Sequence, residues 1–208
     1  MKTGAAWGIS PHMGWAAVAS IAVAKGAVRV IRTDRIATGT TDDPETVEPY
    51  HVAAGIGHLE QAPPPSDGAE IVRRGLEKQQ RHALASMRAL AHELRDAGHA
   101  PAVGAILCGR GRNGSSLERI LASHAQIHIA EGIAVRDALA AALDALRVHA
   151  VMVDRKTLLA QAAATLKLDA AAIIASLKSL RPDNGGPWRQ EQKHAALAAW
   201  LALAQHTR

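Results

Sequence analysis

The chain has 208 residues, 48% of them hydrophobic and only 2% aromatic, and it carries a formal net charge of +5 at pH 7. This length is enough for one domain with a substantial core, and the composition excludes a disordered chain and gives no support to a membrane protein. Because the chain contains no Phe, its core must be built from Ala, Leu, Val and Ile, which favours closely packed helices.

The basic residues are spread along the chain rather than gathered in one cluster. Such a pattern is typical of a solvated surface and only mildly favours an acidic partner such as nucleic acid. The single cysteine, Cys108, cannot form an internal disulfide or a cysteine-based zinc site, which fits a cytoplasmic protein. Gly8, Pro11 and Gly14 interrupt the apolar N-terminal segment, so we expect neither a secretion signal nor a membrane-spanning helix.

The first part of the chain is predicted to be a meander of strands. Residues 13–24 and 27–36 are apolar or alternating segments separated by a two-residue turn, which predicts a β-hairpin. A loop rich in Gly, Thr and Asp follows, and residues 47–59 are predicted to form a third strand. The meander is thus expected within residues 1–62, and a run of three prolines ends it.

The rest of the chain, residues 66–208, is expected to alternate between helices and strands. Helices are predicted at 67–97, 115–146 (with a break near Ser123 or Gly132), 155–166 and 169–180, and from Pro187 onward; apolar strands are predicted at 102–108 and 148–154. Continuous apolar runs are typical of parallel strands that are covered on both faces. The order predicts a single α/β domain, residues 1–208, with a mixed sheet.

A glycine-rich loop lies between the strand at 102–108 and the next helix. Gly109, Gly111 and Gly114 match the spacing G-x-G-x-x-G, and backbone amides of such loops can hold a phosphate at a helix N-terminus. The loop lacks the Gly-Lys-Ser/Thr ending of a P-loop, and no acidic partner for a dinucleotide follows at the expected distance. We therefore interpret it as a phosphate-loop candidate or as a plain connection.

The helix that follows carries the densest polar group in the chain. His124, His128 and Glu131 stand at i, i+4 and i+7, so they share one helix face with the apolar residues that point to the core. Two imidazoles and a carboxylate are a ligand set of catalytic zinc sites, although the spacing is not HExxH. The structural alternative is a helix-capping histidine and a Glu131 paired with Arg136 or with a backbone amide.

The order of three strands followed by alternating helices and strands resembles the ribonuclease H-like superfamily. Its fold is an antiparallel meander and then parallel strands joined through helices, which the crossover rule permits here. Residues 8–16, GISPHMGWA, are similar to the first-strand pattern GxDPGxxxxGxA of Holliday-junction resolvases, and the alanine-rich segment 193–198 is similar to their last helix. The resemblance covers most of the chain and implies a nucleic-acid-associated protein.

The departures from this pattern concern the acids. Those nucleases hold two metal ions with carboxylates, the first from strand one, where this chain has Ser10 followed by His12. The last-helix position has Lys193 or His194, with Glu191 as the nearest acid. Asp34 and Glu131 are the other acids that such a site could recruit. The resemblance therefore implies an incomplete two-metal site.

Three functions remain open from the sequence. The first is a nucleic-acid-associated protein on a ribonuclease H-like scaffold with a degenerate acidic site. The second is a non-catalytic interaction protein, since alanine-rich helices permit close contact between subunits and a homodimer is common among soluble proteins. The third is a metal- or small-molecule-dependent enzyme that uses His124, His128 and Glu131. The sequence names no cofactor and no substrate.

Overall fold

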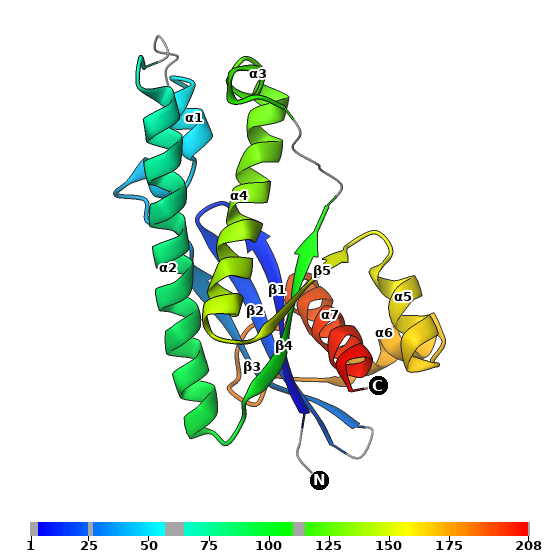
Figure 1. The fold of residues 1–208 in the computed structure, drawn as a ribbon. Coiled ribbons are helices and arrows are strands. Elements are labelled where there is room, and N and C mark those ends of the chain that lie inside the picture. Colours follow the sequence, from blue (N-terminus) through cyan, green and yellow to red (C-terminus); the bar gives the residue numbers. More distant parts are fainter. Residues whose placement is uncertain (1–3, 25–26, 57–64, 110–114, 208) are drawn as a thin grey trace.

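The computed structural model describes residues 4–24, 27–56, 65–109 and 115–207, and a five-stranded mixed sheet lies at its centre (Figure 1). The strands are β1 (Gly4–His12), β2 (Trp15–Ala24), β3 (Ala27–Ala37), β4 (Pro101–Cys108) and β5 (His149–Asp154). Their order across the sheet is β3-β2-β1-β4-β5, with β1 to β3 antiparallel and β4 and β5 parallel to β1. The predicted meander followed by parallel strands is therefore confirmed.

The meander begins and ends earlier in the chain than the sequence predicts. It starts at Gly4 and ends at Ala37. The third strand predicted after residue 46 is wrong, because Pro44 and Pro49 each begin a helical turn, η1 (Pro44–Thr46) and α1 (Pro49–Ala53). The fixed φ of proline suits the first position of a helix and removes a donor that a strand needs. Residues 57–59 of that prediction lie outside the described residues.

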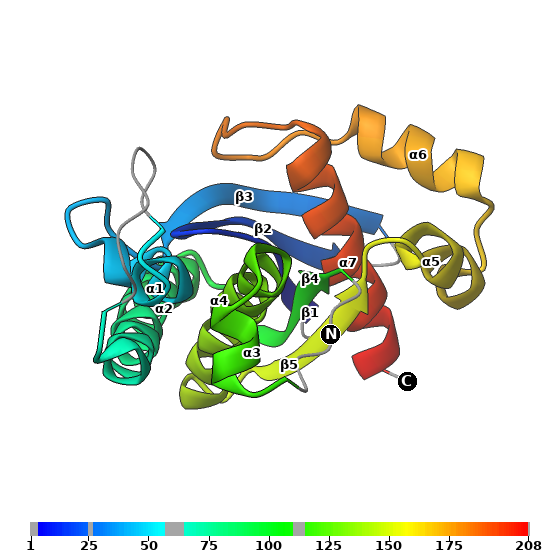
Figure 2. The same cartoon turned by 90° about the horizontal axis from the view of Figure 1, so that it is seen from above.

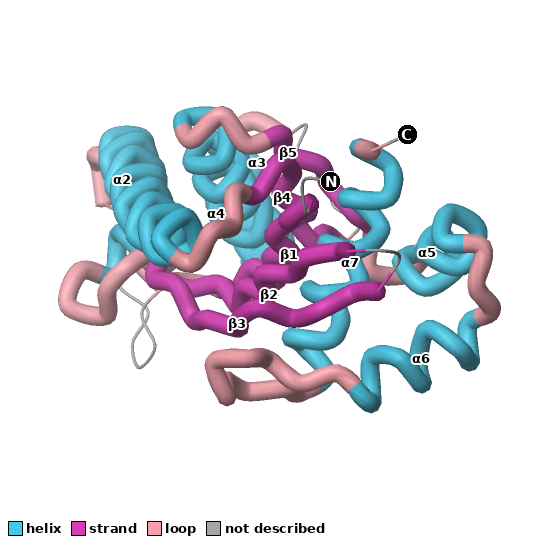
Figure 3. Tube along the Cα trace, turned by 90° about the horizontal axis from the view of Figure 1, so that it is seen from below, coloured by secondary structure: helices cyan, strands magenta, loops and turns pink. Residues whose placement is uncertain are grey.

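Helices cover both faces of the sheet. The longer ones are α2 (Gly68–Asp96), α4 (His124–Ala145), α5 (Leu158–Leu166), α6 (Ala170–Ser179) and α7 (Gln190–His206), and α3 (Leu117–Leu121) is a short helix before α4. α2 and α4 lie on one face, whereas α7, with α5 and α6 beside it, lies on the other (Figures 2 and 3). The central strands are thus buried on both sides, as their continuous apolar sequences indicate.

One predicted helix break is confirmed by the structure, and one predicted helix start is wrong. The helix expected at 115–146 is interrupted between α3 and α4, at the position near Ser123 that the sequence indicates, and Gly132 does not break it. The last helix starts at Gln190 rather than at Pro187, whose carbonyl oxygen accepts a hydrogen bond from Thr33 Oγ1 at 3.0 Å.

Among the described helices, no single one is long and apolar enough to span a bilayer. Helices α5 and α6 meet the length and composition criterion only together, as a pair bent by 98°.

α7 is buried around its whole circumference. Its residues from Ala195 to Leu203 are all buried, against β1, β2 and β4 on one side and α5 on the other. A helix that is apolar on every side needs such an environment. Most of these side chains are alanines, which lets the helix lie close to the sheet, and Gly8 of β1 faces the backbone of Ala195 directly.

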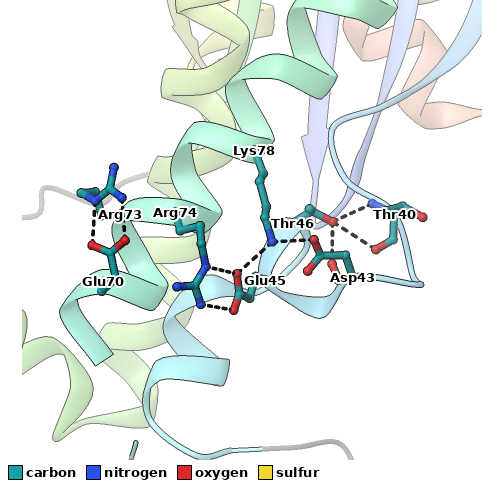
Figure 4. A network of polar contacts seen from close by, with 8 residues as sticks. All are labelled: Thr40, Asp43, Glu45, Thr46, Glu70, Arg73, Arg74 and Lys78. Atoms are coloured by element: carbon teal, nitrogen blue, oxygen red, sulfur yellow. Dashed lines mark hydrogen bonds and ion pairs between the residues drawn. The ribbon is translucent and has the colours of Figure 1, made fainter. Parts of the chain in front are cut away.

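A network of ion pairs ties the segment before α1 to the long helix α2 (Figure 4). Glu45 accepts hydrogen bonds from Arg74 at 2.6 and 2.9 Å and from Lys78 at 3.0 Å. Lys78 also bonds Asp43 at 2.7 Å. The Arg74 guanidinium, with help from Lys78 and against the effect of partial burial, lowers the pKa of Glu45 to about 2. The network therefore holds the segment with Asp43 and Glu45 against α2.

Glu45→Gln is expected to lower the free energy of unfolding by about 1 kcal/mol at pH 7, since solvent screens this partly exposed pair. A carboxyl group with a lowered folded-state pKa stabilises the protein above its unfolded pKa of about 4.5, and this contribution is lost as the pH falls towards about 2. The difference between variant and wild type in urea unfolding should therefore shrink from pH 7 to pH 3. Glu70→Gln, which breaks the exposed pair with Arg73, is the control. It should leave the free energy of unfolding within about 0.5 kcal/mol of the wild type. A Glu45→Gln difference that does not vary with pH would contradict this role.

Candidate functional site

The carboxyl ends of the parallel strands form one edge of a pocket of about 350 Å³, here called the carboxyl-edge pocket. Its polar lining comes from His12 at the end of β1, from His128 and Arg136 on α4, and from Arg155 directly after β5. No carboxylate is among the described residues that line it. In open α/β sheets this edge is the usual place for a ligand. The described lining of the pocket is therefore basic.

Ser10 occupies the first-strand position and is completely buried. Its hydroxyl oxygen accepts a hydrogen bond of 2.9 Å from the Arg155 guanidinium. The backbone amide of Arg155 in turn donates to the carbonyl oxygen of Cys108 at 3.0 Å, which fixes the start of this residue beside the end of β4. Ser10 thus stands at the position that the resemblance assigns to an acid, and its hydroxyl is bonded to a positive group.

The last helix contributes Glu191 and His194 to the same region. Glu191 is hydrogen-bonded to His12, so the acid nearest in sequence to the predicted last-helix position is engaged with a residue of β1. Burial lowers the pKa of His194, and the positive charge of Arg155 lowers it further. His194 is also hydrogen-bonded to Gln190 at 2.8 Å, while Lys193 is only partly buried. Arg155 thus donates a hydrogen bond to Ser10 and acts on His194 through its charge.

The three acids that the sequence leaves for a metal site have three different partners. Asp34 forms an ion pair of 2.6 Å with Arg32 on its own strand. Glu191 contacts His12, and Glu131 accepts hydrogen bonds from the backbone amides of Tyr50 at 2.8 Å and His51 at 3.1 Å. Each acid therefore bonds a different partner, whereas the carboxylates of a two-metal site converge on the same pair of ions.

Glu131 is fully buried between α4 and α1. Burial raises its pKa to about 8, although the two backbone amides act in the opposite direction. The backbone-amide partner was one of the two structural alternatives expected from the sequence. The described residues provide no hydrogen-bond donor to its second oxygen, Oε2. His124 and His128, its neighbours on α4, lie beside His51 from α1, a residue that the sequence analysis missed.

A second hollow, of about 550 Å³, adjoins the carboxyl-edge pocket and shares Met13 with it. It is lined by Trp15 and Arg35, among others. The Trp15 ring is stacked on His12, with ring centres 4.2 Å apart and planes 8° apart, and the Arg35 guanidinium carbon lies 4.1 Å from the Trp15 ring centre. An aromatic and cationic surface therefore continues from the pocket across the β1–β2 turn.

The glycine-rich loop is only partly described. Gly109 lines the carboxyl-edge pocket, whereas Gly111 and Gly114 lie outside the described residues. Ser116, after the loop, caps α3 by accepting a hydrogen bond from the Arg119 amide at 3.4 Å. The predicted phosphate loop stays a prediction.

No protein-family model matches the sequence, and no curated protein matches it either. Among solved structures, the chain is similar to Thermus thermophilus RuvC, with 13% sequence identity, a TM-score of 0.52, and coverage of 98% of this chain and 96% of that chain. RuvC from the same organism in complex with a Holliday junction substrate matches with 13% identity, a TM-score of 0.49 and the same 98% and 96% coverage. The yeast mitochondrial Holliday junction resolvase Ydc2 matches with 11% identity, a TM-score of 0.44, and coverage of 98% of this chain and 81% of that chain. At 13% identity and a TM-score of 0.52, the likeness to Thermus thermophilus RuvC establishes the fold alone, which is the ribonuclease H-like fold.

Proposed function

We propose that this protein binds the phosphate backbone of nucleic acid at the carboxyl-edge pocket and does not cleave it. The observation that carries the proposal is the contact between Arg155 and Ser10, because it sets a guanidinium beside the first-strand position at which the resemblance implies a metal-binding carboxylate. A divalent cation at that position would face the positive charge of Arg155 without a neutralising acid among the lining residues that are described. The same charge favours a phosphate.

The charges of the pocket support phosphate binding. Arg136 and Arg155 line it from two different elements, and neither forms an ion pair with a carboxylate among the described residues. The guanidinium group matches the geometry of phosphate oxygens and can form two parallel hydrogen bonds to them. The formal net charge of +5 adds a long-range attraction for a polyanion.

The hollow beside the pocket supports an extended ligand rather than a single free phosphate. The Trp15 ring is stacked on His12 and lies under Arg35, so its partly exposed edge adjoins the cationic surface. Aromatic side chains accompany backbone contacts in many proteins that bind single strands. A strand could therefore contact the arginines with its phosphates and the exposed edge of Trp15 with a sugar or base.

Binding and cleavage are tested together with the full-length protein. Fluorescence anisotropy with a labelled four-way junction, a duplex and a single strand should show binding at 50 mM salt that weakens strongly at 200 mM. The same substrates incubated with Mg²⁺ or Mn²⁺ should stay intact. Junction DNA is included because RuvC has been solved with a Holliday junction substrate. Absence of binding to all three at low salt would overturn the proposal in favour of a protein interaction module, and metal-dependent cleavage would overturn the non-cleaving part.

A further inference from the structure

Three histidines from two helices converge beside the carboxyl-edge pocket. His51 comes from α1, and His124 and His128 come from the first two turns of α4. One ring nitrogen of each lies within 4.8 Å of the corresponding nitrogen of the other two. His51 is buried, whereas His124 and His128 are exposed. We refer to these residues as the histidine cluster.

The arrangement of the rings fits ligands around one ion. The ring centres are 4.8 Å apart for His51 and His128, 5.5 Å for His51 and His124, and 4.5 Å for His124 and His128. A tetrahedral zinc site with bonds of about 2.0–2.1 Å has ligand nitrogens about 3.4 Å apart and ring centres about 5 Å apart. The interplanar angles of 65°, 90° and 44° show that the rings are not stacked in parallel. Rotation of the exposed His124 and His128 side chains would bring the ring nitrogens, now within 4.8 Å of one another, to the separation of about 3.4 Å that a zinc site needs.

Glu131 gives a second, independent indication of a ligand. Its Oε1 lies 3.3 Å from Nδ1 of His51, and the carboxyl group is fully buried, with no donor to Oε2 among the described residues. Histidines that bind a metal usually donate their other ring N–H to a carboxylate, which fixes the tautomer and makes the ligand more basic. If Nδ1 of His51 donates to Glu131, Nε2 is the atom directed to a metal.

The helices hold the histidine cluster in place. His124 and His128 share one face of α4 because they are one turn apart. Tyr50 of α1 and Ala54, directly after this helix, pack against the buried cluster that contains Ile120, Ile127 and Ala130. The backbone amides of Tyr50 and His51 are in addition hydrogen-bonded to Glu131. A ligand set that is built on packed helices is better oriented than one on loops.

We propose that His51, His124 and His128 bind one Zn²⁺ ion per chain, with Glu131 as the positioning residue of His51. The ligand set differs from the one that the sequence predicts, since Glu131 supports a ligand instead of binding the ion. Three protein ligands leave a fourth position for water or a substrate oxygen, as in catalytic zinc sites. His128 also lines the carboxyl-edge pocket, so this fourth position lies near the pocket that carries Arg136 and Arg155. The zinc proposal does not rest on the proposed binding of nucleic acid.

The test is a titration of tag-free, metal-free, full-length protein with Zn²⁺ in competition with a chromophoric chelator at pH 7.5. We expect one tightly bound Zn²⁺ per chain and a loss of affinity of at least 100-fold in the double variant His124→Ala/His128→Ala. Glu131→Gln should weaken binding by 10- to 100-fold without changing the stoichiometry, as loss of an outer carboxylate partner does. The matched control is His149→Ala/His206→Ala, which removes a second pair of exposed histidines with ring centres 6.0 Å apart and should leave the affinity unchanged.

Co²⁺ substitution supplies a readout that does not depend on affinity. The wild type should show the intense visible absorption of tetrahedral Co²⁺, and His128→Ala should lose it. Equal Zn²⁺ affinity in the wild type and in His124→Ala/His128→Ala would overturn the proposal, as would the absence of any stoichiometric binding. Both replaced side chains are exposed, so the variants are expected to fold, and a shared melting temperature in chelator would verify this. Failure of the nucleic-acid assay would leave this result unaffected.

Discussion

Gly8→Ala is expected to lower the free energy of unfolding by about 4 kcal/mol or more, which is at the extreme of single substitutions. A Cβ atom at this position would overlap the carbonyl group of Ala195 and lie 3.1 Å from its Cα atom. The overlapped atoms are backbone, so no side-chain rotation relieves the clash. α7 would have to move away from β1, and because it is buried on all sides its alanine contacts would be lost with it.

Urea unfolding, followed by circular dichroism, measures this effect. Gly132→Ala on α4 is the matched control, because the nearest atom to the added Cβ is Arg136 Nη1 at 3.9 Å, at the end of a flexible side chain. This control should raise the stability by about 0.5–1 kcal/mol, since alanine favours helix over glycine. A Gly8→Ala protein with an unchanged urea midpoint would show that α7 does not lie as close to β1 as described.

Arg136→Ala/Arg155→Ala is expected to weaken nucleic-acid binding by at least 100-fold at 50 mM salt, which corresponds to a loss of ~2.7 kcal/mol or more. Each guanidinium contributes a charge-assisted hydrogen bond to a phosphate, which is worth about 1.5–3 kcal/mol. The loss should be similar for a junction, a duplex and a single strand, because phosphate contacts carry no sequence information. Anisotropy with the three labelled substrates measures it.

A charge-matched control separates the pocket from the general positive charge. Arg81→Ala/Arg88→Ala removes the same two charges from exposed positions on α2, outside the carboxyl-edge pocket. This variant should bind within about 3-fold of the wild type, an effect of net charge alone. If both double variants lose the same affinity, the pocket has no special part in binding.

The parallel half of the fold could be predicted from the sequence better than the meander. Residues 102–108 and 148–154 are short apolar runs next to amphipathic helices, so their assignment as strands followed from pattern alone. β1 was harder, because GAAWGISPH has few β-branched residues and is covered on both faces, which removes the alternation typical of a strand. The two prolines that begin η1 and α1 were the signal against a third strand there.

The candidate site could be predicted only where its residues are neighbours in sequence. Helical spacing placed His124, His128 and Glu131 on one face, and the first-strand pattern singled out Ser10 and His12. His51 could not be found in this way, because 80 residues separate it from Glu131 and it lay in a segment predicted to be a strand. Arg155 was detectable in principle, since it directly follows an apolar strand whose carboxyl end faces the site.

The central claim is that the carboxyl-edge pocket contacts phosphate through Arg136 and Arg155. The most direct measurement is the dependence of the binding constant on salt concentration, for the wild type and for the two double variants on the same junction DNA. A log–log plot loses about 0.9 in slope for each phosphate contact removed, so Arg136→Ala/Arg155→Ala should reduce the slope by about 2. The α2 control should keep the wild-type slope. Equal slopes for the wild type and the Arg136→Ala/Arg155→Ala variant would contradict the account.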